Sequence, residues 1–183
     1  MNDIQEGIRA VASLMVISAC TAPKGKGADS IVTAVLYRDD LFQLAEKMKE
    51  IGNRVLMPFF ERDAGNIAVS DACVLIGCRG GETLGINCGG CGYSTCAQMH
   101  EQYKINDKNG LFNGPNCVIK MTDLGIAIGS AVKTAQIHNV DNRVLFTAGV
   151  AARELGLLHA CTVAYGIPLS VTGKNIFFDR PIQ

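Results

Sequence analysis

The chain has 183 residues, 48% of them hydrophobic, and its 17 basic residues balance 17 acidic ones. This length and composition fit one domain, residues 1–183, with enough apolar side chains for a packed core. A neutral chain with scattered basic residues and few aromatics has no patch suited to nucleic acid or to an anionic membrane. The uncharged, mainly apolar run at residues 10–23 is shorter than the ~18 apolar residues that a membrane-spanning helix needs.

The first half of the chain alternates between helical and extended patterns. Apolar residues recur at helical spacing over residues 2–19, which predicts an amphipathic helix. We expect a strand at 31–37, a helix at 41–51 and a second strand at 71–77. Residues 54–59 fit neither pattern clearly.

The second half begins with a glycine-rich stretch and then becomes mainly helical. A helix is predicted over 94–106, with Ser94 or Thr95 as its cap, and residues 117–120 are predicted to be extended. The remaining expected elements are a helix over 124–138 capped by Asp123, a helix over 142–156 capped by Asp141, a strand at 160–166 and an irregular arm. This mixture indicates an α+β fold, an α/β sandwich into which residues 78–118 are inserted.

Four of the eight cysteines form one compact pattern. Cys88, Cys91 and Cys96 follow C-x2-C-x4-C, and twenty residues separate Cys96 from Cys117. Glycines separate the first three thiols, and glycine accepts the positive-φ turns that let a backbone wrap around one centre. Gly114-Pro115 predicts a turn just before the fourth cysteine. Four thiolates suit an iron–sulfur cluster or a structural zinc ion.

The spacing favours a cluster over zinc. Zinc cysteines usually come as two short C-x2-C pairs, whereas here three are grouped and one is remote. The stretch CGGCGYSTC resembles the CGxCGxxxC motif of the large subunit of corrinoid iron–sulfur proteins, which implies a [4Fe–4S] cluster on Cys88, Cys91, Cys96 and Cys117. A zinc-stabilised, non-enzymatic interaction module remains the alternative.

The other four cysteines are interpreted differently. Cys20, Cys73 and Cys161 lie in apolar segments, where free cysteines usually pack in the core. Cys78 ends a predicted strand and is either another core residue or a spare ligand. A cluster of metal-binding thiols is typical of a reducing cytoplasm.

The N-terminal segment contains a pattern that resembles a lipoprotein cleavage site. Residues 17–20 read Ile-Ser-Ala-Cys, but the preceding stretch carries Asp3 and Glu6 against Arg9 alone. A secretory signal needs a positive n-region, so we interpret this stretch as a core helix of a cytoplasmic protein.

Several blocks spread along the chain resemble one family. TAPKGKGADSIVTAVL, GINCGGCGYSTCAQM, NGPNC, DLGIAIGSAVKTA, NVDNRV and GIPLSVTGKNIFFDR are similar to an uncharacterised family of prokaryotic ferredoxin-domain-containing proteins. The resemblance implies an iron–sulfur electron carrier or oxidoreductase with an unknown redox partner, and it names no reaction.

The frame around the inserted segment resembles the FMN-dependent nitroreductases. The resemblance rests on a first helix leading into Ala22-Pro23, then a strand, a helix and late paired helices before Gly166-Ile167-Pro168. It implies an α+β homodimer that holds FMN between its subunits. The chain has only Arg9 where those proteins carry an Arg-x-Ser-x-Arg stretch. The candidate FMN phosphate ligands are therefore Lys24, Lys26, Lys174 and Arg180, which are otherwise solvated surface cations.

A homodimer is also expected from the residues themselves. Gly125, Gly129 and Ala131 form a small-residue face that permits close approach of another helix. The arm from Pro168 to Gln183 carries Ile176, Phe177 and Phe178, which must pack either on a neighbouring subunit or back on their own core. We expect the helices at 124–138 and 142–156 and this arm to form the interface.

Overall fold

Four antiparallel strands form one sheet in the computed structural model, which describes residues 3–105 and 110–178. The sheet order is β1-β2-β4-β3. The strands are β1 (Ile31–Leu36), β2 (Ala72–Cys78), β3 (Asp141–Asn142) and β4 (Val163–Ser170). β2 pairs with β1 through residues 73–78 on one side, and along its whole length with β4 on the other. It is the centre of the fold.

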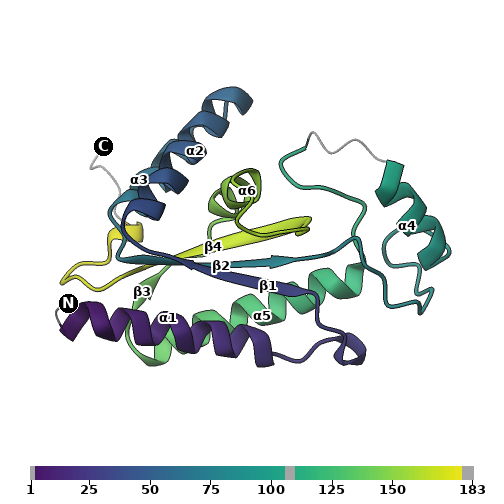
Figure 1. Cartoon of the computed structure of the whole chain (residues 1–183), viewed down its shortest axis with the longest axis horizontal. Helices are drawn as coiled ribbons and strands as arrows, with labels where there is room; N and C mark the ends of the chain where they lie inside the picture. Colours follow the sequence, from purple (N-terminus) through teal and green to yellow (C-terminus); the bar gives the residue numbers. More distant parts are fainter. Residues whose placement is uncertain (1–2, 106–109, 179–183) are drawn as a thin grey trace.

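Helices cover both faces of the sheet (Figure 1). On one face lie α1 (Asp3–Thr21) and α5 (Val118–Ile137), which pack against each other. On the other face lie α2 (Asp39–Val55), α3 (Phe59–Ala68) and α6 (Phe146–Glu154). α4 (Cys96–Ile105) stands apart, beyond one end of the sheet. Two short 3-10 turns complete the chain, η1 (Gly25–Gly27) and η2 (Ile176–Phe178).

The central strand is apolar because both of its faces are covered. Every residue of β2 is buried. Val74 and Ile76 point into the core under α1 and α5, whereas Cys73 and Leu75 point into the core under α2 and α6. A continuous apolar run is the expected pattern for a strand with helices on both sides. Within the described residues, no helix combines the length and the apolar character needed to cross a membrane.

The structure confirms the mixed fold and the strands expected at 31–37 and 71–77, but it corrects several elements. Residues 54–59 contain the end of α2 and the start of α3, joined through Leu56 in a left-handed conformation. The strand expected at 160–166 spans Val163–Ser170. It extends further because β2 and β3 pair with it through Leu169 and Ser170.

Both aspartates expected to cap helices do something else. Asp123 lies inside α5, because residues 118–120, expected to be extended, form the helix's first turn. Its carboxylate Oδ1 instead accepts the Gly25 N–H at 3.0 Å. Asp141 belongs to β3, opposite Ser170, and the helix expected from residue 142 begins at Phe146.

α6 rests directly on the sheet at Gly149. A Cβ at this position would lie 1.8 Å from the carbonyl oxygen of Ala164 in β4. Real side chains do not approach backbone this closely, so only glycine permits the observed distance between α6 and β4.

We predict that Gly149→Ala lowers the free energy of unfolding by about 3 kcal/mol, because α6 must move off β4. The matched control is Gly65→Ala in α3, where an added Cβ meets open space. This control should raise stability by about 0.5–1 kcal/mol through helix propensity. Urea denaturation measures both variants. Equal stability of Gly149→Ala and the natural protein would contradict the packing described for α6.

Candidate metal centre

The four patterned cysteines line one cavity. Cys88, Cys91, Cys96 and Cys117 border a space of about 300 Å³, counted with the part that is open to solvent. It lies in the segment between the end of β2 and the start of α5, beside α4 at the right of Figure 1. The apolar part of the cavity wall is formed by Val118 and by Met99, which is fully buried.

Backbone hydrogen bonds close the base of this segment. The Cys117 N–H donates to the Gly80 carbonyl at 2.8 Å, and the Gly80 N–H donates to Thr162 Oγ1 at 3.0 Å. A Cβ on Gly80 would lie 2.3 Å from Asn116 Oδ1 and 2.7 Å from Thr162 Oγ1, so a side chain at this position would displace both of these groups. The segment that carries the cysteines is therefore anchored to the sandwich at both of its ends, Gly80 and Cys117.

Positive-φ residues wrap the loop around the cavity. Gly85, Asn87, Gly89 and Gly92 all have positive φ, and a tight turn forms where Gly92 N–H donates to the Gly89 carbonyl at 2.9 Å. Gly90 approaches Val118 so closely that a Cβ would lie 2.7 Å from its Cγ1. The glycine spacers thus serve the wrapping that the sequence predicts.

The start of α4 fixes the third thiol. Thr95 Oγ1 accepts the Gln98 N–H, and Gln98 Oε1 accepts the Thr95 N–H, each at 3.2 Å. This reciprocal pair is a capping box, and it confirms Thr95 as the cap. Cys96 is the first residue of the helix, and its N–H donates to Asn87 Oδ1 at 2.8 Å.

The environment of Cys96 favours its thiolate. The Asn87 N–H approaches the sulfur at 3.4 Å and is the main cause that lowers the pKa of Cys96. Backbone groups of Gly85 and Ile86 and the Thr83 hydroxyl lower this pKa further. A helix N-terminus also stabilises negative charge on a cysteine.

Cys117 also lies at a helix N-terminus, one position earlier relative to its helix than Cys96. It immediately precedes α5 and acts as its N-cap residue. Two helix N-termini therefore adjoin one cavity, and both carry partial positive charge. Cys117 is buried at 6% exposure, whereas Cys88 is exposed, so the cavity is closed on the α5 side and open on the loop side.

The thiols surround a space rather than a point. Within residues 3–105 and 110–178, no group of three or more His, Cys, Asp or Glu side chains has the compact arrangement of a single metal ion's ligands. The four cysteines instead border the shared cavity from separate positions on its wall.

The remaining cysteines lie outside this cavity. Cys78 is buried, with its sulfur 3.3 Å from Ser30 Oγ and 3.5 Å from the Lys120 carbonyl oxygen, and burial raises its pKa. Burial likewise raises the pKa of Cys73 to about 12 and that of Cys161 to about 11. The core role expected for Cys20 is wrong, because it is exposed on the solvent side of α1.

The four candidate phosphate ligands are not brought together within one subunit. Lys24 is almost buried, and its ammonium donates to the carbonyls of Ala19, Cys20 and Ala22 at the end of α1. Lys26 donates to the Leu84 carbonyl at 3.1 Å. Lys174 is exposed in the turn after β4, whose last residues pair with the start of β2, and Arg180 lies outside the described residues.

Asn87 and Met99 are parts of the site that the sequence pattern did not predict. Asn87 shapes the loop, contacts Cys96 through its backbone and side chain, and has a positive φ of 49°. An asparagine just before the first cysteine was the available signal, because asparagine tolerates this conformation better than most residues. Met99 had no such signal, since its burial depends on how α4 folds over the cavity.

The fold is shared with solved flavoproteins. A BluB-like flavoprotein from Clostridium difficile 630 matches with a TM-score of 0.58 and 16% identity, over 100% of this chain and 85% of that one. A nitroreductase from Lactococcus lactis in complex with nicotinic acid matches with a TM-score of 0.58 and 12% identity, over 93% and 84% of the chains. A nitroreductase with bound FMN from Desulfitobacterium hafniense DCB-2 has a TM-score of 0.53 and 14% identity, over 95% and 80%. These likenesses show a nitroreductase-like fold.

The sequence relatives are more specific. An uncharacterized protein from Archaeoglobus fulgidus is 41% identical over 175 residues, which cover 96% of this chain and 92% of the relative. Residues 113–180 match the family described as "Uncharacterized protein containing a ferredoxin domain (DUF2148)", and this stretch includes Cys117. The chain therefore belongs to this family of uncharacterised ferredoxin-domain proteins.

Proposed function

We propose that this protein is an iron–sulfur electron carrier or oxidoreductase that holds one [4Fe–4S] cluster on Cys88, Cys91, Cys96 and Cys117. The observation that carries the proposal is that all four thiols line one cavity, although Cys117 is remote in sequence. Membership of a ferredoxin-domain family supports an iron–sulfur role.

The residues around the cavity fit such a group. Thiolates are the protein ligands that iron–sulfur clusters use, and the Asn87 N–H supplies a hydrogen bond to the Cys96 sulfur. Two helix N-termini offset the negative charge of the thiolates. Met99 and Val118 exclude water from the inner wall. A cluster bound there supplies transfer of one electron at a time.

The asymmetry of the site determines where electrons enter and leave. Cys117 is buried beside the sandwich, and Cys88 is exposed on the outer loop. A redox partner therefore reaches the centre from the loop side. Ile86, which is exposed next to this loop, provides apolar surface for that contact.

The first test replaces the ligands. Cys88→Ser, Cys91→Ser, Cys96→Ser and Cys117→Ser should each lower the iron and sulfide content of anaerobically purified protein, because a hard alkoxide is a poor match for iron. Cys20→Ser is the matched control, since this cysteine is exposed on α1 and far along the chain from the cavity.

Iron and sulfide assays give the readout for all five variants. Natural iron content in Cys117→Ser would remove Cys117 from the proposed ligand set. A colourless protein that contains zinc in place of iron would favour the alternative, a zinc-stabilised interaction module.

A second candidate function is an FMN-dependent reductase that receives electrons from the cluster. The supporting observation is the fold, since one of the solved nitroreductases of the same fold has bound FMN and another is in complex with FMN. Lys26 contacts Leu84, beyond the Cys78 end of β2, whereas Lys174 follows the end of β4 that pairs with Ala72 at the other end of β2. A phosphate held by both would therefore need cations from two subunits.

Titration of the protein into FMN, followed by quenching of flavin fluorescence, tests this candidate. We expect saturable quenching that Lys26→Gln and Lys174→Gln weaken by about tenfold each, with riboflavin as the control that lacks the phosphate. Absence of quenching at high micromolar protein would leave the cluster as the sole cofactor.

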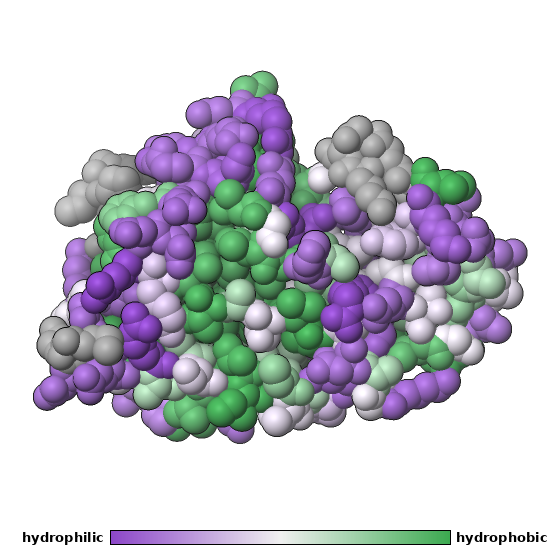
Figure 2. Space-filling model, viewed as in Figure 1, coloured by the Kyte–Doolittle hydropathy of each residue, from purple (hydrophilic) through white to green (hydrophobic). Residues whose placement is uncertain are grey.

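We propose further that the chain is a homodimer that meets through the outer faces of α1 and α5. No charged residue follows Arg9 in α1, and Leu14 and Ile17 are exposed there. On α5 Ile126 is exposed, and Gly125 and Gly129 face open space. Figure 2 shows apolar surface across the middle of the face that α1 and β1 form. Such patches usually mark interaction sites.

Other parts of the expected interface are used within the subunit. Ala131 is fully buried, and all α6 residues from Thr147 to Ala152 are buried against the chain's own sheet and helices. Phe177 of the arm is also buried, and Arg143 donates to its carbonyl at 2.8 Å. Phe178 is the exposed aromatic of the arm, and the Arg143 guanidinium lies 5.3 Å from its ring centre.

Sedimentation equilibrium decides the assembly. We expect the natural protein to have twice the 19.5 kDa chain mass at micromolar concentration, and Ile126→Glu to shift it toward the monomer. Phe42→Glu is the control, because Phe42 is an exposed apolar residue on the opposite layer. A natural protein that sediments near 19.5 kDa would refute the dimer.

A further inference from the structure

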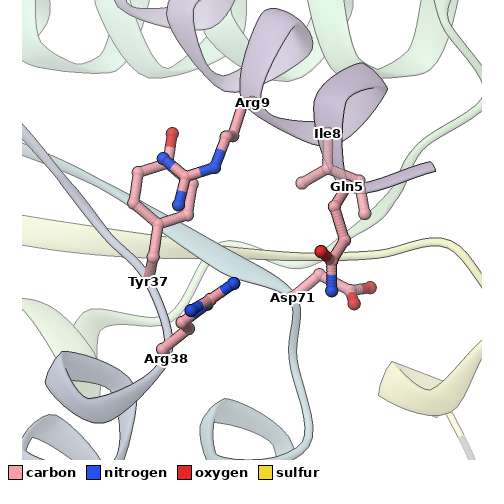
Figure 3. A pocket seen from close by; sticks show the side chains of 6 residues that line it. All are labelled: Gln5, Ile8, Arg9, Tyr37, Arg38 and Asp71. Atoms are coloured by element: carbon pink, nitrogen blue, oxygen red, sulfur yellow. The ribbon is translucent and has the colours of Figure 1, made fainter. Parts of the chain in front are cut away.

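A second cavity lies at the end of the sheet that is remote from the cysteines. Gln5, Ile8, Arg9, Tyr37, Arg38 and Asp71 line it, as Figure 3 shows. Its space is about 340 Å³, counted with the part open to solvent. Asp71 immediately precedes β2, and the cysteine segment leaves from the other end of this 7-residue strand. At ~3.3 Å per residue, β2 therefore separates the two cavities by roughly 20 Å.

Two arginines from different elements approach this cavity. Arg9 comes from α1, and its Cζ lies 4.1 Å from the centre of the Tyr37 ring. Arg38 comes from the junction of β1 and α2, on the other side of Tyr37 (Figure 3). Stacking on the ring holds the Arg9 guanidinium in place while its N–H edge stays open to other partners.

Neither guanidinium is paired with a carboxylate among the described residues. In the part of the chain that the structure describes, no ion pair and no hydrogen bond of the Arg9 or Arg38 guanidinium is formed, although other arginines pair with carboxylates. Arg38 also adopts a φ of 49° and a ψ of −115°, outside the regions that non-glycine residues favour. Backbone strain of this kind is often found at binding sites.

The opposite wall carries an acceptor. Asp71 Oδ2 accepts the Val171 N–H at 3.1 Å, which fixes the carboxylate at the rim. The lining groups thus carry two positive charges and one negative charge. A ligand that satisfies both walls needs oxyanion oxygens for the guanidinium groups and a hydroxyl proton for the carboxylate.

We propose that this cavity binds a phosphate group, either as inorganic phosphate or as a small phosphate monoester. The guanidinium groups of Arg9 and Arg38 donate to the phosphate oxygens, for which their planar forks are suited. Asp71 accepts the remaining proton of the phosphate or a hydroxyl of the esterified group. This site does not depend on the metal centre, because the length of the sheet lies between them.

Calorimetric titration of the full chain with inorganic phosphate, and separately with glycerol 3-phosphate, tests the proposal. We expect saturable binding of at least one of the two, weakened about tenfold in Arg9→Gln and in Arg38→Gln. Arg38→Lys should retain part of the affinity, because it keeps the charge and loses the bidentate fork. Lys49→Gln is the charge-matched control on α2, where it should leave binding unchanged.

The two probes distinguish the source of the phosphate. Tighter binding of glycerol 3-phosphate indicates that the cavity takes a monoester, and equal or weaker binding indicates that it takes the free ion. Two results would overturn the proposal: no saturable binding of either probe up to about 10 mM, or full affinity in both glutamine variants. Arg38 is exposed, so Arg38→Gln leaves the packing of the core unchanged, and a loss of phosphate binding in this variant reports on the site itself.

Discussion

The backbone hydrogen bond from Cys117 to Gly80 is the contact on which the candidate metal centre depends. It joins the two ends of a long excursion, so that a cysteine at the start of α5 faces three cysteines of the preceding loop. Gly80 and Thr162 connect this base to the end of β2, which is buried on both faces. The cysteine segment has little hydrophobic core of its own, and these hydrogen bonds hold it in place on the sandwich.

The frame and the cysteine segment contribute different properties. The sandwich is the one seen in flavoproteins, with helices on both faces of an antiparallel sheet. The cysteine segment extends from one end of the sheet, and the cavity with Arg9 and Arg38 lies at the other end. The first cavity is lined by the cysteine loop and the starts of α4 and α5, and the second by α1 and the residues next to β1 and β2.

Local chemistry explains why much of the site was predictable. The cysteine spacing, the glycine spacers and the Thr95 cap all act over a few residues. In the structure glycines supply positive-φ turns, Thr95 caps α4, and the four cysteines predicted as ligands line one cavity. The central strand was also predictable, because continuous apolar character is a local signal. These features can be predicted without knowing where distant parts of the chain lie in the fold.

Tertiary contacts explain what could not be predicted. Residues 118–120 favour extended structure by composition, yet they begin α5, a helix that packs along α1. One contact between these helices joins Thr134 Oγ1 and Ser18 Oγ at 2.6 Å. From the sequence alone, Lys24 is interpreted as a solvated cation. In the structure its ammonium donates to three backbone carbonyls at the end of α1, which use all three of its N–H donors. From the sequence alone, Asp123 is expected to cap a helix. In the structure its carboxylate accepts a hydrogen bond from the N–H of Gly25, which is 98 residues away in the chain.

The most direct test of the central claim is the spectrum of the anaerobically purified natural protein. Visible absorption combined with electron paramagnetic resonance of the dithionite-reduced sample reports on the cluster itself. A cubane on the four cysteines predicts a broad brown absorption that bleaches on reduction, a low-temperature paramagnetic signal and about four iron atoms per chain. A protein that is colourless and silent before and after reduction would contradict the account.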